Sequence, residues 1–190
     1  MKKILKLLLA IVFILGFVYI ILPGPASRDQ IPALPDSQKS IEPGDTTQNP
    51  NNVGYYSDHR RSFITAFYYL AFQKMDPIGK LIPPIRLNYP PEDAFTYVRD
   101  QERSTFLEEY VYPLRESIFV NGYEPLIKNG RSISRDADFV IVDGMYFNSK
   151  TVVRIYPSPL SLRVVIYLGI WVSLLGIGFV GRKIFKERES

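Results

Sequence analysis

Residues 106–123 read FLEEYVYPLRESIFVNGY, two short runs rich in aromatic and β-branched residues. Runs of this kind are typical of β-strands, and they predict one strand over 106–112 and another over 117–120. The Asn121-Gly122 pair predicts a hairpin turn after the second strand, because both central positions of a type I′ turn need a positive φ. The stretch therefore predicts an antiparallel sheet.

The strand pattern continues toward the C-terminus. We expect further strands at 139–142, 145–147 and 151–156. Between the first two of these, Asp143-Gly144 predicts a second tight turn. These strands extend the predicted antiparallel sheet.

Two helices and an edge strand are expected before residue 106. One helix covers residues 58–75, and a second begins after Pro90, because proline is tolerated in a first helical turn. The first helix either is buried in the domain core or lies at a membrane interface. Prolines at the start of 81–87 restrict that strand to an edge. The predicted fold class is α+β, with about two helices and a mainly antiparallel sheet of four to five strands in a domain at 54–158.

The segment before this domain has a different composition. Residues 23–53 contain six prolines and many small polar residues, with no apolar period. Such a composition is typical of segments that do not build a core. We therefore expect a Pro-rich flexible linker over 23–53.

Two apolar runs enclose the linker and the domain. They cover residues 7–22 and 164–181, and each is close to the length that crosses a bilayer. The second predicted transmembrane helix spans 162–181. Basic tails at 1–6 and 182–190 adjoin them, so the positive-inside rule places both termini in the cytoplasm. This predicts a protein of the cytoplasmic (plasma) membrane with two transmembrane helices and an extracytoplasmic domain 54–158. The first run is expected to be an uncleaved signal anchor, and a cleaved signal peptide is the alternative.

The net charge of +4 belongs to the tails and not to the domain. Residues 24–160 hold 15 Lys and Arg against 17 Asp and Glu, which gives −2 for the outer segment. A segment without a net basic field does not recruit nucleic-acid phosphates. No nucleic-acid partner is therefore expected.

The residue inventory also restricts the chemistry. The chain has no cysteine and one histidine, His59, which excludes thiol nucleophiles, zinc–cysteine sites and multi-histidine metal sites. Residues 176–181 match GxGxxG, but no strand precedes them and no acid follows at the distance that dinucleotide binding needs. A calcium site at Asp136, Asp138 and Asp143 is the alternative to a solvated loop. No metal and no cofactor are expected.

The segment 99–124 is the richest in both charge and aromatic residues. Arginines interleaved with tyrosines are common in recognition surfaces for proteins and acidic glycans. Surface ion pairs between the acids and arginines are the alternative. The predicted binding residues are Arg99, Arg103, Glu109, Tyr110, Tyr112, Arg115 and Tyr123.

The second apolar run carries a row of small residues. Gly169, Ser173 and Gly176 follow one another at spacings of four and three, which places them on one helix face. Small residues let a partner backbone approach closely within a membrane. We predict that these three residues form a helix-packing face.

The surroundings of this run resemble a known family in layout. Pro157 and Pro159 precede the run, Gly169 and Gly176 lie within it, and Arg182 follows it. With two spans flanking an outer α+β domain, this layout resembles polysaccharide co-polymerases and implies regulation of envelope glycan length. The chain departs from that family because it lacks the fuller proline repeat and has no room for a long helical arm.

Together these features predict a two-span membrane protein that displays an extracytoplasmic α+β binding domain. We expect a non-catalytic accessory or scaffold subunit of a cell-envelope assembly. Its predicted partners are the lipid bilayer and another membrane or envelope protein, with an envelope glycan as a further candidate. The alternatives are a co-polymerase-like regulator of glycan length and an enzyme of envelope polymers that uses Glu102, Glu109 or Glu116.

Overall fold

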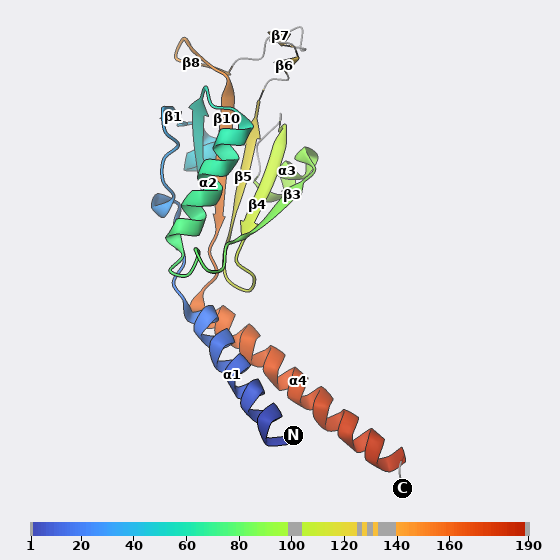
Figure 1. The fold of residues 1–190 in the computed structure, drawn as a ribbon. Coiled ribbons are helices and arrows are strands. Elements are labelled where there is room, and N and C mark those ends of the chain that lie inside the picture. Colours follow the sequence, from blue (N-terminus) through green and yellow to red (C-terminus); the bar gives the residue numbers. More distant parts are fainter. Residues whose placement is uncertain (1, 99–103, 125–126, 129–130, 133–139, 189–190) are drawn as a thin grey trace. The chain divides into compact units, whose positions relative to one another are not determined.

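The computed structural model describes residues 2–98, 104–124, 127–128, 131–132 and 140–188 (Figure 1). The chain divides into two compact units. One comprises residues 1–22 and 158–190, and the other comprises Pro23–Pro157.

The second unit is an α+β domain built on an antiparallel sheet (Figure 1). The sheet has six strands, whereas the sequence predicts four to five. The predicted strand at 106–112 is β4, and the predicted strand at 151–156 is β10, at the centre of the sheet. In spatial order the strands are β1 (Ser37–Lys39), β2 (Asn52–Ser57), β10 (Ser149–Tyr156), β5 (Ser117–Tyr123), β4 (Phe106–Val111) and β3 (Ile85–Tyr89).

The Asn121-Gly122 pair does not form the predicted turn. Strand β5 runs straight through it, with Asn121 opposite Leu107 and Gly122 opposite Phe106. A Cβ at position 122 would clash with the Phe106 ring, at 2.6 Å from its Cε1 atom and closer still to its Cζ atom. The glycine is required because an aromatic side chain crosses its backbone, and its φ is not positive.

The Asp143-Gly144 turn is confirmed. Val142 faces Met145 across it, in the hairpin of β8 (Val140–Val142) and β9 (Met145–Phe147). These two strands form a sheet of their own and do not extend the six-stranded sheet as predicted. Asp143 and Gly144 have φ of 50° and 79°, the positive values that a type I′ turn needs. A second small pair joins β6 (Ile127–Lys128) to β7 (Arg131–Ser132).

Helix α2 (Arg61–Met75) packs on one face of the six-stranded sheet. Its side chains Ile64, Tyr68 and Phe72 are fully buried in the main core. Of the two predicted positions for this helix, the structure therefore shows the one in the domain core. Tyr69 is half-buried, and its ring meets Tyr110 edge-on.

The opposite face carries a smaller core. Leu107, Phe119 and Val152 of the sheet pack there against Ala94 and Val98. The covering elements follow Pro90, as predicted, but they are short: the 3₁₀ turn η3 (Pro91–Asp93) and the helix α3 (Ala94–Tyr97). The edge strand expected at 81–87 begins only at Ile85, after the two prolines.

Residues 23–53 differ from the predicted flexible linker. Ile31 and Leu34 are buried in the main core, and β1 pairs with β2 at the edge of the sheet. The 3₁₀ turn η1 (Arg28–Gln30) precedes Ile31. The π-helical turn η2 (Pro43–Thr47) connects β1 to β2, which already begins at Asn52. The burial of two apolar side chains and the pairing of one strand attach this segment to the domain. Neither requires a repeating apolar pattern, which the segment lacks.

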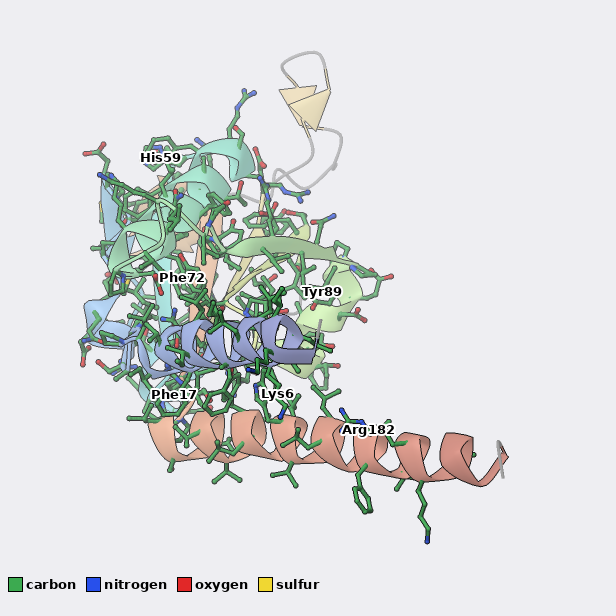
Figure 2. The ribbon with its side chains drawn as sticks, turned by 60° about the horizontal axis from the view of Figure 1, so that its bottom comes forward. Lys6, Phe17, His59, Phe72, Tyr89 and Arg182 are labelled. Carbon is green, nitrogen blue, oxygen red and sulfur yellow. The ribbon has the colours of Figure 1, made fainter. Side chains whose placement is uncertain are left out.

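The first unit contains helices α1 (Lys2–Ile21) and α4 (Leu160–Arg188), both long and apolar enough to cross a membrane. They are antiparallel, because Tyr167 donates to the Phe13 carbonyl (2.7 Å) while Arg163 donates to the Leu22 carbonyl (3.1 Å). Figure 2 shows Phe17 between the two helices, and its ring lies 6.2 Å from that of Tyr167. Gly16 allows this approach, since a Cβ there would meet the Tyr167 hydroxyl.

Candidate functional site

Five of the seven predicted binding residues are described by the structure, and three of these five lie inside the domain. Tyr110 and Tyr112 are at most 1% exposed and Arg115 is 5% exposed, so these three do not form the expected surface. Glu109 and Tyr123 are half-buried, and Glu109 accepts a hydrogen bond from Tyr89 (2.7 Å). The two remaining predictions, Arg99 and Arg103, lie outside the described residues, as does Glu102.

The interior contains an acid that sequence reasoning passed over, Glu108 of β4. Its side chain is 1% exposed and lies on the α2 side of the sheet. One carboxylate oxygen accepts hydrogen bonds from Arg61 (3.0 Å) and Arg86 (2.7 Å), and the other accepts from Tyr110 (2.9 Å). The alternation Phe106, Glu108, Tyr110 is the signal that could have found it, because every second residue of a strand faces the same side.

This network keeps Glu108 ionised. Burial alone would raise its pKa, but the hydrogen bonds from Arg86, Arg61 and Tyr110 outweigh burial and leave the pKa below its usual value. A carboxylate held in this way does not donate a proton near neutral pH. The geometry therefore indicates a structural ion pair that ties β3 and α2 to β4.

We predict that Glu108 makes domain stability depend on pH. Because its folded-state pKa is lowered, its contribution is present above the unfolded pKa of about 4.3 and is lost as pH falls through the folded value. Urea unfolding of the wild type should therefore show a lower midpoint below pH 4 than at pH 7. In Glu108→Gln, the urea midpoint should fall less between pH 7 and pH 4. An equal fall of the midpoint in the two proteins would contradict the assignment.

A second charge cluster ties η2 to the sheet. Lys150 of β10 contacts Glu42 (2.7 Å) and Asp45 (2.9 Å), and Asp45 accepts a hydrogen bond from Ser40 (2.7 Å). Burial raises the pKa of the adjacent Tyr56 to about 12. Lys150 is partly buried, which alone would lower its pKa, but hydrogen bonds to Glu42 and Asp45 raise it. The contact between Lys150 and Glu42 favours the charged form of both, because it lowers the pKa of Glu42 and raises the pKa of Lys150.

A third cluster is fully buried where α2 ends. Arg115 contacts Asp76 (2.6 Å) and Glu116 (2.7 Å), and none of the three side chains is more than 1% exposed. The same guanidinium nitrogen donates to the Pro23 carbonyl (3.3 Å). The cluster thus joins the end of α2, the β4–β5 loop and the first residue of the domain.

The acids proposed for catalysis are held in separate contacts. Glu109 binds Tyr89, whereas Glu116 binds Arg115. His59 stacks on Phe63 with ring centroids 4.0 Å apart, and its Nε2 lies 3.0 Å from the Pro35 carbonyl. Among the described residues, no group of three His, Asp or Glu side chains could hold a metal ion. Asp136 and Asp138 of the calcium alternative lie outside the described part of the chain.

The predicted helix-packing residues on α4 do not contact α1. A Cβ added at Gly169 or Gly176 would meet nothing within 4 Å, and the Ser173 hydroxyl donates back to the Gly169 carbonyl (2.9 Å). The α1–α4 contact runs through Tyr167 instead. Packing of the small-residue face against another helix stays a prediction.

The β8–β9 hairpin exposes several large apolar side chains. Ile141, Met145 and Tyr146 are 50–65% exposed in this two-stranded structure. Phe147 anchors its base on Tyr56, with ring centroids 5.8 Å apart. The hairpin precedes β10 and therefore lies at the end of the sheet opposite Tyr156, where the chain leaves the domain.

Comparison with family models, with curated proteins and with solved structures found no match to this chain. The fold and the charge clusters are therefore interpreted from their own geometry.

Proposed function

We propose that this chain is a two-span protein of the cytoplasmic membrane that displays its α+β domain on the extracytoplasmic side. In this proposal the domain is a non-catalytic binding module, and the protein is an accessory or scaffold subunit of a cell-envelope assembly. The bilayer and another envelope protein are its partners.

The charges of the two helices support the membrane orientation. Because α1 and α4 are antiparallel, the start of α1 and the end of α4 lie at the same end of the pair. Lys3 and Lys6 lie at the start of α1, and Arg182 and Lys183 lie near the end of α4. Figure 2 labels Lys6 and Arg182. Basic residues at one end of a helical pair favour the cytoplasmic side for that end.

The observation that carries the binding function is the exposed β8–β9 hairpin. An isolated two-stranded hairpin is marginally stable in water, and exposed clusters of large apolar side chains mark interaction sites. Ile141, Met145 and Tyr146 supply such a cluster. A protein partner that covers it would bury the apolar surface and order the hairpin.

Two further features favour a scaffold over an enzyme. The interior acids Glu108, Asp76 and Glu116 are each bound by arginine, which suits a structural role better than proton transfer. The small-residue face of α4 leaves room for another membrane helix.

A cysteine-directed cross-linking experiment tests this proposal. The chain has no cysteine, so Met145→Cys introduces a single thiol on the hairpin. We expect a membrane-impermeant thiol reagent to label it in intact cells, and a bifunctional version to capture a protein partner. Arg182→Cys is the control, and it should react only after the cells are permeabilised.

The possible results separate the two parts of the proposal. Labelling of Met145→Cys only after permeabilisation would overturn the orientation. Labelling in intact cells without a reproducible protein adduct would leave the orientation in place and remove the hairpin as the binding surface.

A further inference from the structure

We infer that two loops of the domain insert apolar side chains into the lipid interface of the membrane. We call these side chains the apolar rim: Leu81 and Ile82 in the α2–β3 loop, and Leu114 in the β4–β5 loop. The inference rests on the proposed function, because it requires α1 and α4 to cross a bilayer.

The two loops lie at the same end of the domain. Asp76, at the start of one loop, contacts Arg115 of the other at 2.6 Å. Ser117, which ends the β4–β5 loop, pairs with Tyr156, the last residue of β10. The rim therefore lies at the end where the chain leaves the domain, and Figure 1 shows the loops after α2 and β4 together at this end.

The rim is highly exposed for its residue types. Leu81 is 81% exposed, Ile82 is 43% exposed and Leu114 is 49% exposed. Exposed leucine and isoleucine lose favourable burial energy in water. Contact with lipid would remove this apolar surface from water.

The charge pattern of the loops fits an interface. Their two acids, Asp76 and Glu116, are buried against Arg115. The exposed charge that remains in residues 76–84 and 112–116 is Lys80, next to Leu81. A lysine beside apolar residues suits the headgroup region, because its stem contacts the apolar layer while its ammonium group reaches the phosphates.

The backbone at Leu114 supports a role beyond folding. Leu114 has φ of 62°, in the left-handed region that glycine or asparagine adopts at lower cost. A leucine there costs backbone energy, and its exposed side chain recovers little through packing in the domain. Insertion into lipid gives this side chain an apolar environment.

The covalent chain brings this end close to a bilayer. Three residues, 157–159, separate the end of β10 from the start of α4 at Leu160. The four extended steps from Tyr156 to Leu160 reach at most about 14 Å. If α4 spans a membrane, the end of the sheet is held near the surface of that membrane. Lipid is therefore the partner that the apolar rim would contact.

Fluorescent probes on single cysteines test the inference in the full-length protein. Leu81→Cys and Leu114→Cys carry an environment-sensitive fluorophore, in liposomes of phosphatidylcholine and phosphatidylglycerol. Ile41→Cys (80% exposed) and Met145→Cys (50% exposed) are controls of matched exposure. We expect the rim probes to emit at shorter wavelength than the controls and to lose intensity when the lipids carry a shallow nitroxide quencher.

Each outcome bears on a different claim. Protein that does not float with the liposomes would overturn the membrane proposal itself. Protein that floats, with rim probes that emit like the controls, would overturn the rim alone. Rim probes whose emission moves to shorter wavelength without quenching by the nitroxide lipids would show contact with a second protein surface. This result too would overturn lipid insertion. Two independent sites keep the test valid if one labelled variant misfolds.

Discussion

Replacing Arg115 with methionine is expected to lower the free energy of unfolding of the domain by about 3–5 kcal/mol. Arg115 lies between Asp76 and Glu116, at 2.6 and 2.7 Å, with all three side chains buried. Methionine fills much of the same volume but removes the Arg115 guanidinium from both buried carboxylates. Leaving charges uncompensated in a buried site is far more costly than losing a surface ion pair.

Pulse proteolysis in urea, on the full-length protein in mild detergent, measures this change. Fluorescence of the single tryptophan is unsuitable, because Trp171 lies in α4 and not in the domain. Arg60→Met is the matched control, since Arg60 is exposed and its loss should change stability by less than about 0.5 kcal/mol. Equal effects of the two substitutions would show that the cluster does not stabilise the domain.

Gly122→Ala is expected to cost about 1–3 kcal/mol of domain stability, although alanine is normally the better residue in a strand. A Cβ at position 122 would lie 2.6 Å from Cε1 of the Phe106 ring and 3.0 Å from the Lys150 carbonyl oxygen. Phe106 is 1% exposed and sits directly opposite in the β4–β5 register, so its ring has little freedom to move away.

The double variant with Phe106→Leu isolates this steric cause. Phe106→Leu alone removes apolar contacts and should also destabilise the domain. If the ring is the obstacle, the two substitutions together should cost less than their sum by about 0.5–3 kcal/mol, the usual coupling of residues in contact. Strict additivity in urea unfolding would show instead that the glycine matters for another reason.

The general outline of the fold could be predicted because it depends on local patterns. The long apolar helices and the period-two alternation of residues 106–111 are visible without tertiary knowledge. The turn at Asp143-Gly144 was predicted correctly, and both residues adopt a positive φ there. The same kind of signal at Asn121-Gly122 was wrong, because β5 pairs with β4 through these two residues.

The candidate site was less predictable, because burial depends on neighbours that are distant in the sequence. Tyr110, Tyr112 and Arg115 have the composition of a recognition surface, yet α2 and the chain at Pro23 cover them. Glu108 is surrounded by Arg61 and Arg86, which lie 47 and 22 residues away. No local pattern indicates such partners.

By itself, the sequence determined two apolar helices with basic ends, a mainly antiparallel α+β domain and one hairpin turn. Periodicity, length and permitted φ decide these features within a few residues. The tertiary structure alone decided that Gly122 lies under a ring, that residues 23–53 belong to the domain and that its interior charges are paired. These outcomes depend on which side chains meet across the sheet, and a one-dimensional pattern does not contain that information.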